Sequence, residues 1–266
     1  DYREEVFLQI KGAFEQFAVQ LDLPDVRFLP ISALHGDNVV EPSTNMDWFE
    51  GTPLLSLLES IEISSDLNHA DTRFPVQYVI RPQSTEHHDY RGYAGRIAGG
   101  TFVPGSAVKV LPSGQTSTIK SIDFYGDSLE EAYPPMSVTF TLEDDIDISR
   151  GDMIVGENET PNVSQDVELM VCWLSEKPLA LNGKYALRHT TKDVRCVIKE
   201  IRYKLNISTL EKRYDDKSVN MNDIACITLR VTKPLVFDSY HRNRATGSLI
   251  LIDEGTHNTV GAGMIL

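Results

Sequence analysis

The spacing of apolar residues changes near Ser64, and this change limits the possible folds more than any other feature of the chain. Before it, apolar side chains recur every three or four residues, as on one face of a helix, at Phe7, Ile10, Phe14, Phe17 and Leu21. After it, apolar residues alternate with others, as in a half-buried strand, at Phe74, Val76, Tyr78 and Ile80 and at Val138, Phe140 and Leu142. The chain is therefore predicted to begin with helices and to continue as a β structure.

Residues 1–66 are predicted to be the end of an α/β unit. The first helix is expected over residues 2–21, and the apolar run 26–31 predicts a strand buried on both faces of a parallel sheet. A second helix is expected with Thr52 as its cap and Pro53 at its first position. Its inward-facing residues would be Leu54, Leu57, Leu58 and Ile61.

Two successive β-barrels are predicted to follow, over residues 71–156 and 164–266. Glycine- and proline-rich turns separate short strands in the first of these segments, which favours a small closed barrel. The polar, turn-rich stretch 156–165 is typical of a linker. Alternation resumes after it, at Val167, Leu169, Val171 and Trp173 and at Ile227, Leu229 and Val231. The predicted fold is mainly β, with an α/β remnant before two barrels.

The composition of the chain excludes some classes of binding partner. The chain has 25 basic and 39 acidic residues and a formal charge of −14, which opposes binding to a nucleic-acid backbone. Cys172, Cys196 and Cys226 have no zinc-type spacing and are expected to be reduced, buried thiols. The sequence contains neither a secretory segment nor an apolar stretch approaching 18 residues. We therefore expect a cytoplasmic protein that binds neither nucleic acid nor membrane.

The tripeptide Ser32-Ala33-Leu34 follows the apolar run 26–31 and is the candidate binding motif. Three such residues alone carry little information, and their simplest role is a strand-to-helix turn. However, a strand of an open α/β sheet delivers its following loop to the edge where ligands bind. With two barrels after it, the arrangement resembles the translational-type GTPases, in which a Ser-Ala-Leu loop contacts guanine.

Four stretches of the barrels make the resemblance more specific: RFPVQYVIRP, YRGYAGRIAGG, LEDDIDISRGD and HRNRATGSLILIDEGTHNTVGAGMI. They are similar to the regulatory GTPase subunit of bacterial sulfate adenylyltransferase, and the resemblance covers essentially the whole chain. It implies that the intact protein uses GTP and Mg²⁺ and assembles with a small catalytic subunit as a heterodimer or larger complex. Together they would form adenosine 5′-phosphosulfate and pyrophosphate from ATP and sulfate.

The resemblance assigns a role to one loop only. Backbone amides and a hydroxyl of Ser32, Ala33 and Leu34 would meet the six-oxo edge of guanine. A buried donor there selects the carbonyl acceptor and rejects the amino group of adenine.

Other GTPase motifs are missing from the sequence. It has no GxxxxGK[ST] phosphate loop and no NKxD, and Gly183-Lys184 is followed by Tyr185. The DxxG matches at 89–92 and 123–126 lack a preceding phosphate loop, so chance explains them better. Because the chain starts at Asp1 within a helical pattern, we expect a fragment without most of its GTPase domain, catalytically inert and without a bound cofactor.

The remaining polar clusters are expected to be structural. Residues 86–89 (Glu-His-His-Asp) favour a solvent loop, and the acidic run 143–147 favours a solvated strand end. His189, His241 and His257 are expected to be hydrogen-bonding residues, so no catalytic or metal-binding residue is assigned.

Two other functions remain open. One is a translation-type GTPase whose barrels carry aminoacylated tRNA, which the net charge disfavours. The other is a scaffold without switching. The sequence also leaves open whether an adenylylsulfate kinase domain follows residue 266, which barrel contacts the partner, what the oligomeric state is and whether residues 1–66 are ordered alone.

Overall fold

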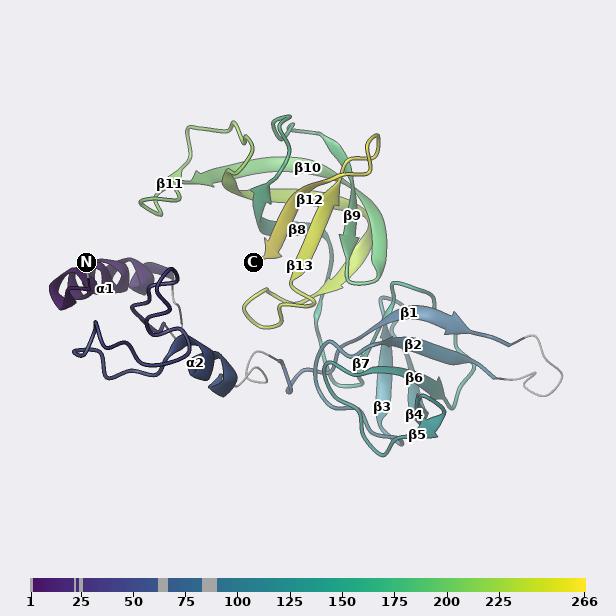
Figure 1. Cartoon of the computed structure of the whole chain (residues 1–266). Coiled ribbons are helices and arrows are strands. Elements are labelled where there is room, and N and C mark those ends of the chain that lie inside the picture. The colour runs from purple at the N-terminus through teal and green to yellow at the C-terminus, as the bar shows by residue number, and fades with distance from the viewer. Residues whose placement is uncertain (1, 22, 24–25, 62–66, 83–89) are drawn as a thin grey trace. The chain divides into compact units, whose positions relative to one another are not determined.

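The computed structural model describes residues 2–21, 23, 26–61, 67–82 and 90–266 (Figure 1). The chain divides into two compact units, Asp1–Asp66 and Leu67–Leu266. None of the described helices is long and apolar enough to span a membrane.

The first unit contains two helices connected by irregular chain. Helix α1 spans Glu4–Ala18 and continues as the 3₁₀ turn η1, Val19–Leu21, while α2 is the short helix Leu54–Ser60. Aromatic rings hold α1 against the rest of the unit. Phe7 lies 5.3 Å from Trp48, and Phe14 lies 5.8 Å from Phe28, measured between ring centroids.

The predicted strand over residues 26–31 is absent, although this segment is partly buried. A strand of a parallel sheet needs neighbouring strands to take its backbone hydrogen bonds, and the described part of the first unit provides none. For the same reason the apolar helix faces are poorly covered. Ile10 is 63% exposed and Leu58 is 58% exposed. The cap of α2 is Pro53 rather than Thr52, and it makes no side-chain capping hydrogen bond.

The first β-barrel closes from six antiparallel strands. Hydrogen bonding runs in the order β3-β7-β1-β2-β6-β4 and returns from β4 to β3, while the two-residue β5 extends β4. The strands are β1 Phe74–Ile80, β2 Gly92–Arg96, β3 Ala107–Leu111, β4 Gln115–Phe124, β5 Asp127–Ser128, β6 Ser137–Leu142 and β7 Met153–Gly156. Phe74, Phe102 and Phe140 meet in its core, with Phe74 and Phe140 stacked at 4.1 Å.

Strand β1 departs from the predicted alternation. Its register against β2 shifts between Val76 and Tyr78, as at a β-bulge. Val76 is fully buried, whereas Tyr78, predicted to share its face, is 66% exposed. One extra residue in a strand reverses the face of every side chain after it. The bulge therefore places Tyr78 on the outer surface of the barrel.

The second β-barrel closes in the same way, in the order β10-β12-β8-β14-β13-β9 and back to β10, with β11 extending β10. Its strands are β8 Asn162–Trp173, β9 Lys184–His189, β10 Lys192–Leu205, β11 Lys212–Arg213, β12 Ile224–Phe237, β13 Ser248–Ile252 and β14 Thr259–Ile265. All the alternating residues predicted on β8 and β12 are buried in its core. The mainly β fold with two barrels is thus confirmed.

Candidate functional site

The Ser-Ala-Leu motif forms a closed turn in the first unit. The Ser32 amide donates to the carbonyl oxygen of Asp37 at 3.1 Å, and the Gly36 amide donates back to the Ser32 carbonyl at 2.7 Å. Gly36 has φ +80°, a left-handed conformation that glycine adopts without a steric penalty. The Ser32 hydroxyl accepts a hydrogen bond from the His35 amide at 3.4 Å. Six residues therefore form one tight loop with a defined backbone.

At the tip of this loop, two amides remain free for a ligand. Among the described residues, the Ala33 and Leu34 amides make no hydrogen bond to another part of the chain. The Leu34 side chain is 88% exposed, so it adds nothing to the core of this unit. Two adjacent free amides beside a serine hydroxyl can receive a carbonyl oxygen, which is the chemistry expected of a guanine-contact loop.

The loop contains no group for bond chemistry. His35 is exposed, and Asp37 is engaged in hydrogen bonds within the unit. An open recess of about 500 Å³ lies between the loop and helix α1, lined by Val6, Phe7, Ile10 and Ile31 among others. Its lining also includes polar side chains such as Arg3, Ser32 and His35. The sequence has no phosphate loop beside this turn, so the two free amides offer donors for one acceptor atom and not for a triphosphate.

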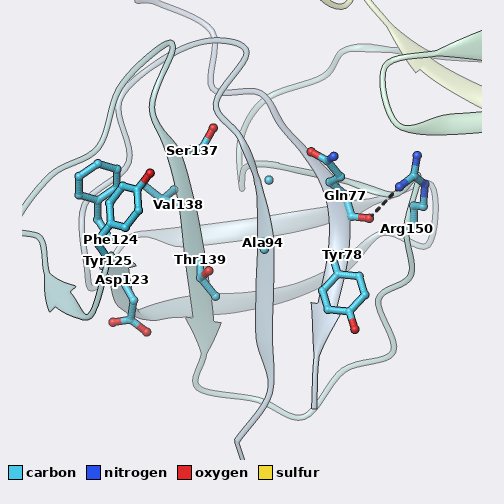
Figure 2. Close-up of a pocket in the computed structure, with 11 residues that line it drawn as sticks. Gln77, Tyr78, Ala94, Asp123, Phe124, Tyr125, Ser137, Val138, Thr139 and Arg150 are labelled. Atoms are coloured by element: carbon cyan, nitrogen blue, oxygen red, sulfur yellow. Dashed lines mark hydrogen bonds between the residues drawn. The ribbon is translucent and has the colours of Figure 1, made fainter. Parts of the chain in front are cut away.

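The first barrel has a second recess, of about 400 Å³, on its outer surface (Figure 2). Its walls include Tyr78 on one side and the Phe124–Tyr125 pair on the other, with Ala94 between them. The two rings of that pair lie 4.7 Å apart. The bulge in β1 creates this recess, because it turns Tyr78 outward.

The polar groups around this recess do not form a catalytic arrangement. The Arg150 guanidinium donates to the Gln77 carbonyl at 3.3 Å (Figure 2), and Asp123 lies at the opposite side. No nucleophile is paired with a base here, so the recess can bind a group but has no means to transform it. Asp123 belongs to a DxxG match, and its place at the end of β4 agrees with the interpretation of that match as chance.

A buried ionic network joins the two barrels. Arg73, only 2% exposed, donates two hydrogen bonds of 2.8 Å to the carboxylate of Asp238 and also pairs with Glu159. Asp238 accepts a further bond, of 2.7 Å, from the Thr246 hydroxyl. Burial opposes the charge of Arg73, but hydrogen bonds from the guanidinium to Asp238 and Glu159 outweigh it and raise its pKa. The barrels therefore share one charge-paired junction.

Glu159 lies in the stretch predicted to be a linker. It is more than part of a connection, because its carboxylate contacts residues at the start of the first barrel. The segment between β7 and β8 spans residues 157–161. One carboxylate oxygen of Glu159 accepts from the Thr72 amide at 2.8 Å, and the other pairs with Arg73. The connection between the barrels is thus fixed to the start of the first one.

A second set of contacts surrounds this network. Arg242 donates bonds of 2.7 and 2.6 Å to the two carboxylate oxygens of Asp71, and this pairing lowers the Asp71 pKa to about 2. The Asn243 side chain donates to the Ala98 carbonyl at 2.9 Å. His189, fully buried, lies 2.7 Å through its Nε2 from the Thr246 carbonyl, so that nitrogen carries the proton.

The sequence did not predict the pairing of Arg73, Glu159 and Asp238. In contrast, His189 is a hydrogen-bonding residue, as expected. Arg242, which the sequence places next to Asn243 and Arg244, is paired with an acid. An arginine directly before an apolar strand, as Arg73 is before β1, was the one available signal, because a charge so placed must find a partner when the strand is buried.

The other candidate clusters have structural roles or lie outside the described residues. The cluster at 86–89 lies outside them. In the acidic run 143–147, Asp144 accepts a 2.8 Å bond from Ser117 and Asp145 pairs with Arg91. No group of three His, Cys, Asp or Glu side chains among the described residues could hold a metal ion. Cys196 and Cys226 are buried free thiols and Cys172 is partly buried, close to expectation.

Solved structures share this fold. The crystal structure of sup35 complexed with GMPPNP matches 100% of this chain and 65% of that chain, with a TM-score of 0.69 at 17% identity. The apo form of translation elongation factor SelB from Methanococcus maripaludis matches 80% of this chain and 46% of that chain, with a TM-score of 0.60 at 16% identity. A family model described as GTP-eEF1A C-terminal domain-like matches residues 166–266. In its fold, the chain belongs to the class that these solved structures define.

Sequence relatives identify the family within this class. Sulfate adenylyltransferase subunit 1 of Alteromonas mediterranea is 47% identical over 266 residues, which are 100% of this chain and 55% of the relative. The bifunctional enzyme CysN/CysC of Mycobacterium tuberculosis is 46% identical over 99% of this chain and 43% of the relative. This chain belongs to the sulfate adenylyltransferase subunit 1 family. It spans about half the length of these relatives.

Proposed function

We propose that this chain is the base-contact and two-barrel part of the GTPase subunit of a sulfate adenylyltransferase. In the complete complex, GTP hydrolysis would be coupled to the formation of adenosine 5′-phosphosulfate and pyrophosphate from ATP and sulfate. The observation that carries this proposal is the 42–47% identity to subunit 1 proteins along the whole chain. The domains would be 1–66, 71–156 and 164–266.

Within this function the chain contributes recognition and mechanical coupling. Ser32, Ala33 and Leu34 would contact the six-oxo edge of guanine through the two free amides and the hydroxyl. GTP would supply the hydrolysable phosphates and Mg²⁺ would stabilise their charge, both held by residues that this sequence lacks. The junction around Arg73 would make the barrels move together, so that a nucleotide-dependent change could bias the conformation of a partner.

The 266-residue chain alone is expected to hydrolyse no GTP, because it has no phosphate loop. Phosphate release should be measured with the purified chain and Mg²⁺, beside a longer protein that includes the missing half of the family's sequence. The longer protein should turn over GTP and the short chain should not. Turnover by the short chain at a comparable rate would contradict the assignment of phosphate binding to other residues.

The partner would be the small catalytic subunit, bound through the barrels. The longer protein, immobilised through a tag, should retain that subunit, and pyrophosphate release from ATP and sulfate should rise with GTP but not with a non-hydrolysable analogue. Stimulation that is equal with both nucleotides would exclude coupling to hydrolysis. Retention with no nucleotide effect at all would favour a plain scaffold.

The alternative is a translation-type carrier of aminoacylated tRNA, since the same fold occurs in translation factors. The net charge of −14 opposes it. Filter binding of tRNA across a salt series separates the two functions, because a carrier shows a steep loss of affinity with salt. The family assignment predicts no measurable retention of tRNA at about 0.15 M salt.

A further inference from the structure

The Ser-Ala-Leu loop is closed by the backbone of Asp37, and the carboxylate of the same residue is held by other groups of the unit. The Asp37 carbonyl accepts the hydrogen bond from the Ser32 amide, so the position of Asp37 determines where the loop begins and ends. Asp37 is a buried residue in a unit with few buried side chains. A carboxylate held at this point can fix the direction of the two free amides at the loop tip.

Three donors converge on the Asp37 carboxylate, two from the chain that follows it and one from the residues just before helix α1. The Ser43 hydroxyl donates to Oδ1 at 2.6 Å and the Asn45 side-chain amide donates to the same oxygen at 3.0 Å. The Tyr2 hydroxyl donates to Oδ2 at 2.9 Å. The hydrogen bond from Ser43 is the main cause that lowers the pKa of Asp37, so the carboxylate is ionised at neutral pH. Both carboxylate oxygens of Asp37 therefore accept hydrogen bonds that hold this side chain in place.

The next residue, Asn38, also fixes the backbone on both sides of the loop through hydrogen bonds. Asn38 is almost fully buried and has φ +53°, a left-handed conformation that asparagine tolerates better than most residues. Its side chain donates to the Pro30 carbonyl at 3.0 Å and accepts from the Ser43 amide at 2.8 Å. Both ends of the loop are therefore tied to the chain around Ser43.

We propose that Asp37 is a positioning residue for guanine recognition, acting through the backbone of Ser32, Ala33 and Leu34. It would touch no nucleotide atom. Its carboxylate would hold the loop so that the two free amides point to one place, where the six-oxo group of the base fits and an amino group does not. This inference rests on the proposed function and adds to it the residue that sets the preference for guanine over a base with a six-amino group.

The test compares GTP with the triphosphate of 2,6-diaminopurine riboside, which carries an amino group in place of the six-oxo group and has no proton on N1. Affinities are measured in the longer family protein with its phosphate-binding half present. Asp37→Ala should weaken GTP binding by about tenfold while changing diaminopurine nucleotide binding by less than about twofold, so the preference collapses. Asp37→Asn keeps one acceptor oxygen for Ser43 and Asn45 and should have an intermediate preference.

Asp47→Ala is the matched control, since it removes an exposed carboxylate of the same segment that makes no hydrogen bond or ion pair in the described residues. It should leave both affinities unchanged. Equal weakening of the two nucleotides by Asp37→Ala, or an unchanged preference, would overturn the inference. If Asp37→Ala does not fold, Ser43→Ala provides the same comparison. Failure of the unmodified longer protein to prefer GTP would instead refute the proposed function.

Discussion

At the scale of single residues, the informative positions are buried polar groups that a sequence does not mark. Arg73, Asp238 and His189 are almost fully buried, and each has a specific partner. A buried charge without a partner is costly, so such residues are retained with their partners. Their chemistry is structural, and it determines how the two barrels respond to pH and to substitution.

His189 should make the second barrel less stable in mild acid. Burial lowers its pKa below the ordinary 6.5, so the folded protein keeps the ring neutral where the unfolded chain takes up a proton. The free energy of unfolding should therefore fall as the pH drops below about 6.5, by at most about 1.4 kcal/mol per pH unit from this residue. Urea unfolding at pH 7.5 and 5.5 measures the slope.

His189→Gln provides the comparison for this slope. Glutamine can still donate to the Thr246 carbonyl but cannot take up a proton in this range. The variant should lose less stability between the two pH values than the parent chain. Equal losses in both proteins would show that other groups cause the pH dependence.

At the scale of elements, close backbone approach shapes the first barrel. Gly95 in β2 faces Val76 of β1 beside the bulge. A methyl group at Gly95 would overlap the carbonyl oxygen of Pro75 and lie 3.0 Å from the Phe74 ring. The bulge, and with it the outward position of Tyr78, requires a residue without a side chain at this point.

Gly95→Ala should therefore destabilise the first barrel by about 1–3 kcal/mol, the usual cost of forcing an extra methyl group into a packed region. A backbone carbonyl within a sheet cannot move aside as a flexible side chain can. Ser137→Ala, on the adjacent exposed end of β6, should change stability by less than about 0.5 kcal/mol. Denaturant midpoints measure both. A Gly95→Ala midpoint equal to that of Ser137→Ala would contradict the predicted overlap.

At the scale of the two-barrel unit, the junction decides whether the barrels act as one body. Arg73 starts the first barrel, Asp238 follows the last residue of β12 in the second, and Glu159 lies in the connection between them. A small apolar cluster of Met153, Val155 and Val236 accompanies them. Because these charges are shielded from water, the free-energy cost of burying each one is offset only by its pairing with the others.

Arg73→Met should cost about 3–5 kcal/mol, since it leaves Asp238 and Glu159 without their cation. We also expect the single unfolding transition of residues 67–266 to separate into two, as the barrels lose their common network. Arg188→Met is the matched control, because Arg188 and Asp193 form an exposed pair. Such pairs contribute about 0–1 kcal/mol. Calorimetry on both variants tests this, and a single transition with an equal loss of stability in each would refute the coupling.

The sequence by itself determined that helices come first and that short strands separated by turns follow from about residue 74. Alternation over residues 167–173 and 227–231 predicted the buried face of the second barrel correctly, because in a paired strand the side-chain period is two wherever the core lies on one side. Residues 32–34 form a turn, as their simplest interpretation predicted, and their contact with guanine stays a prediction. Local rules are sufficient for such features, since they depend on residues close together in the chain.

Only the tertiary structure decided the rest. The face on which Tyr78 lies depends on a register shift between two strands. The hydrogen bonds that hold the Asp37 carboxylate include one from Tyr2, which is 35 residues away. The role of Glu159 depends on its pairing with Arg73, which is 86 residues away. The segment 26–31 has a sequence pattern typical of a strand, but it forms no strand because the described part of its unit has no neighbouring strands to pair with it. In each case the free energy comes from a contact between groups far apart in sequence, which local spacing does not encode.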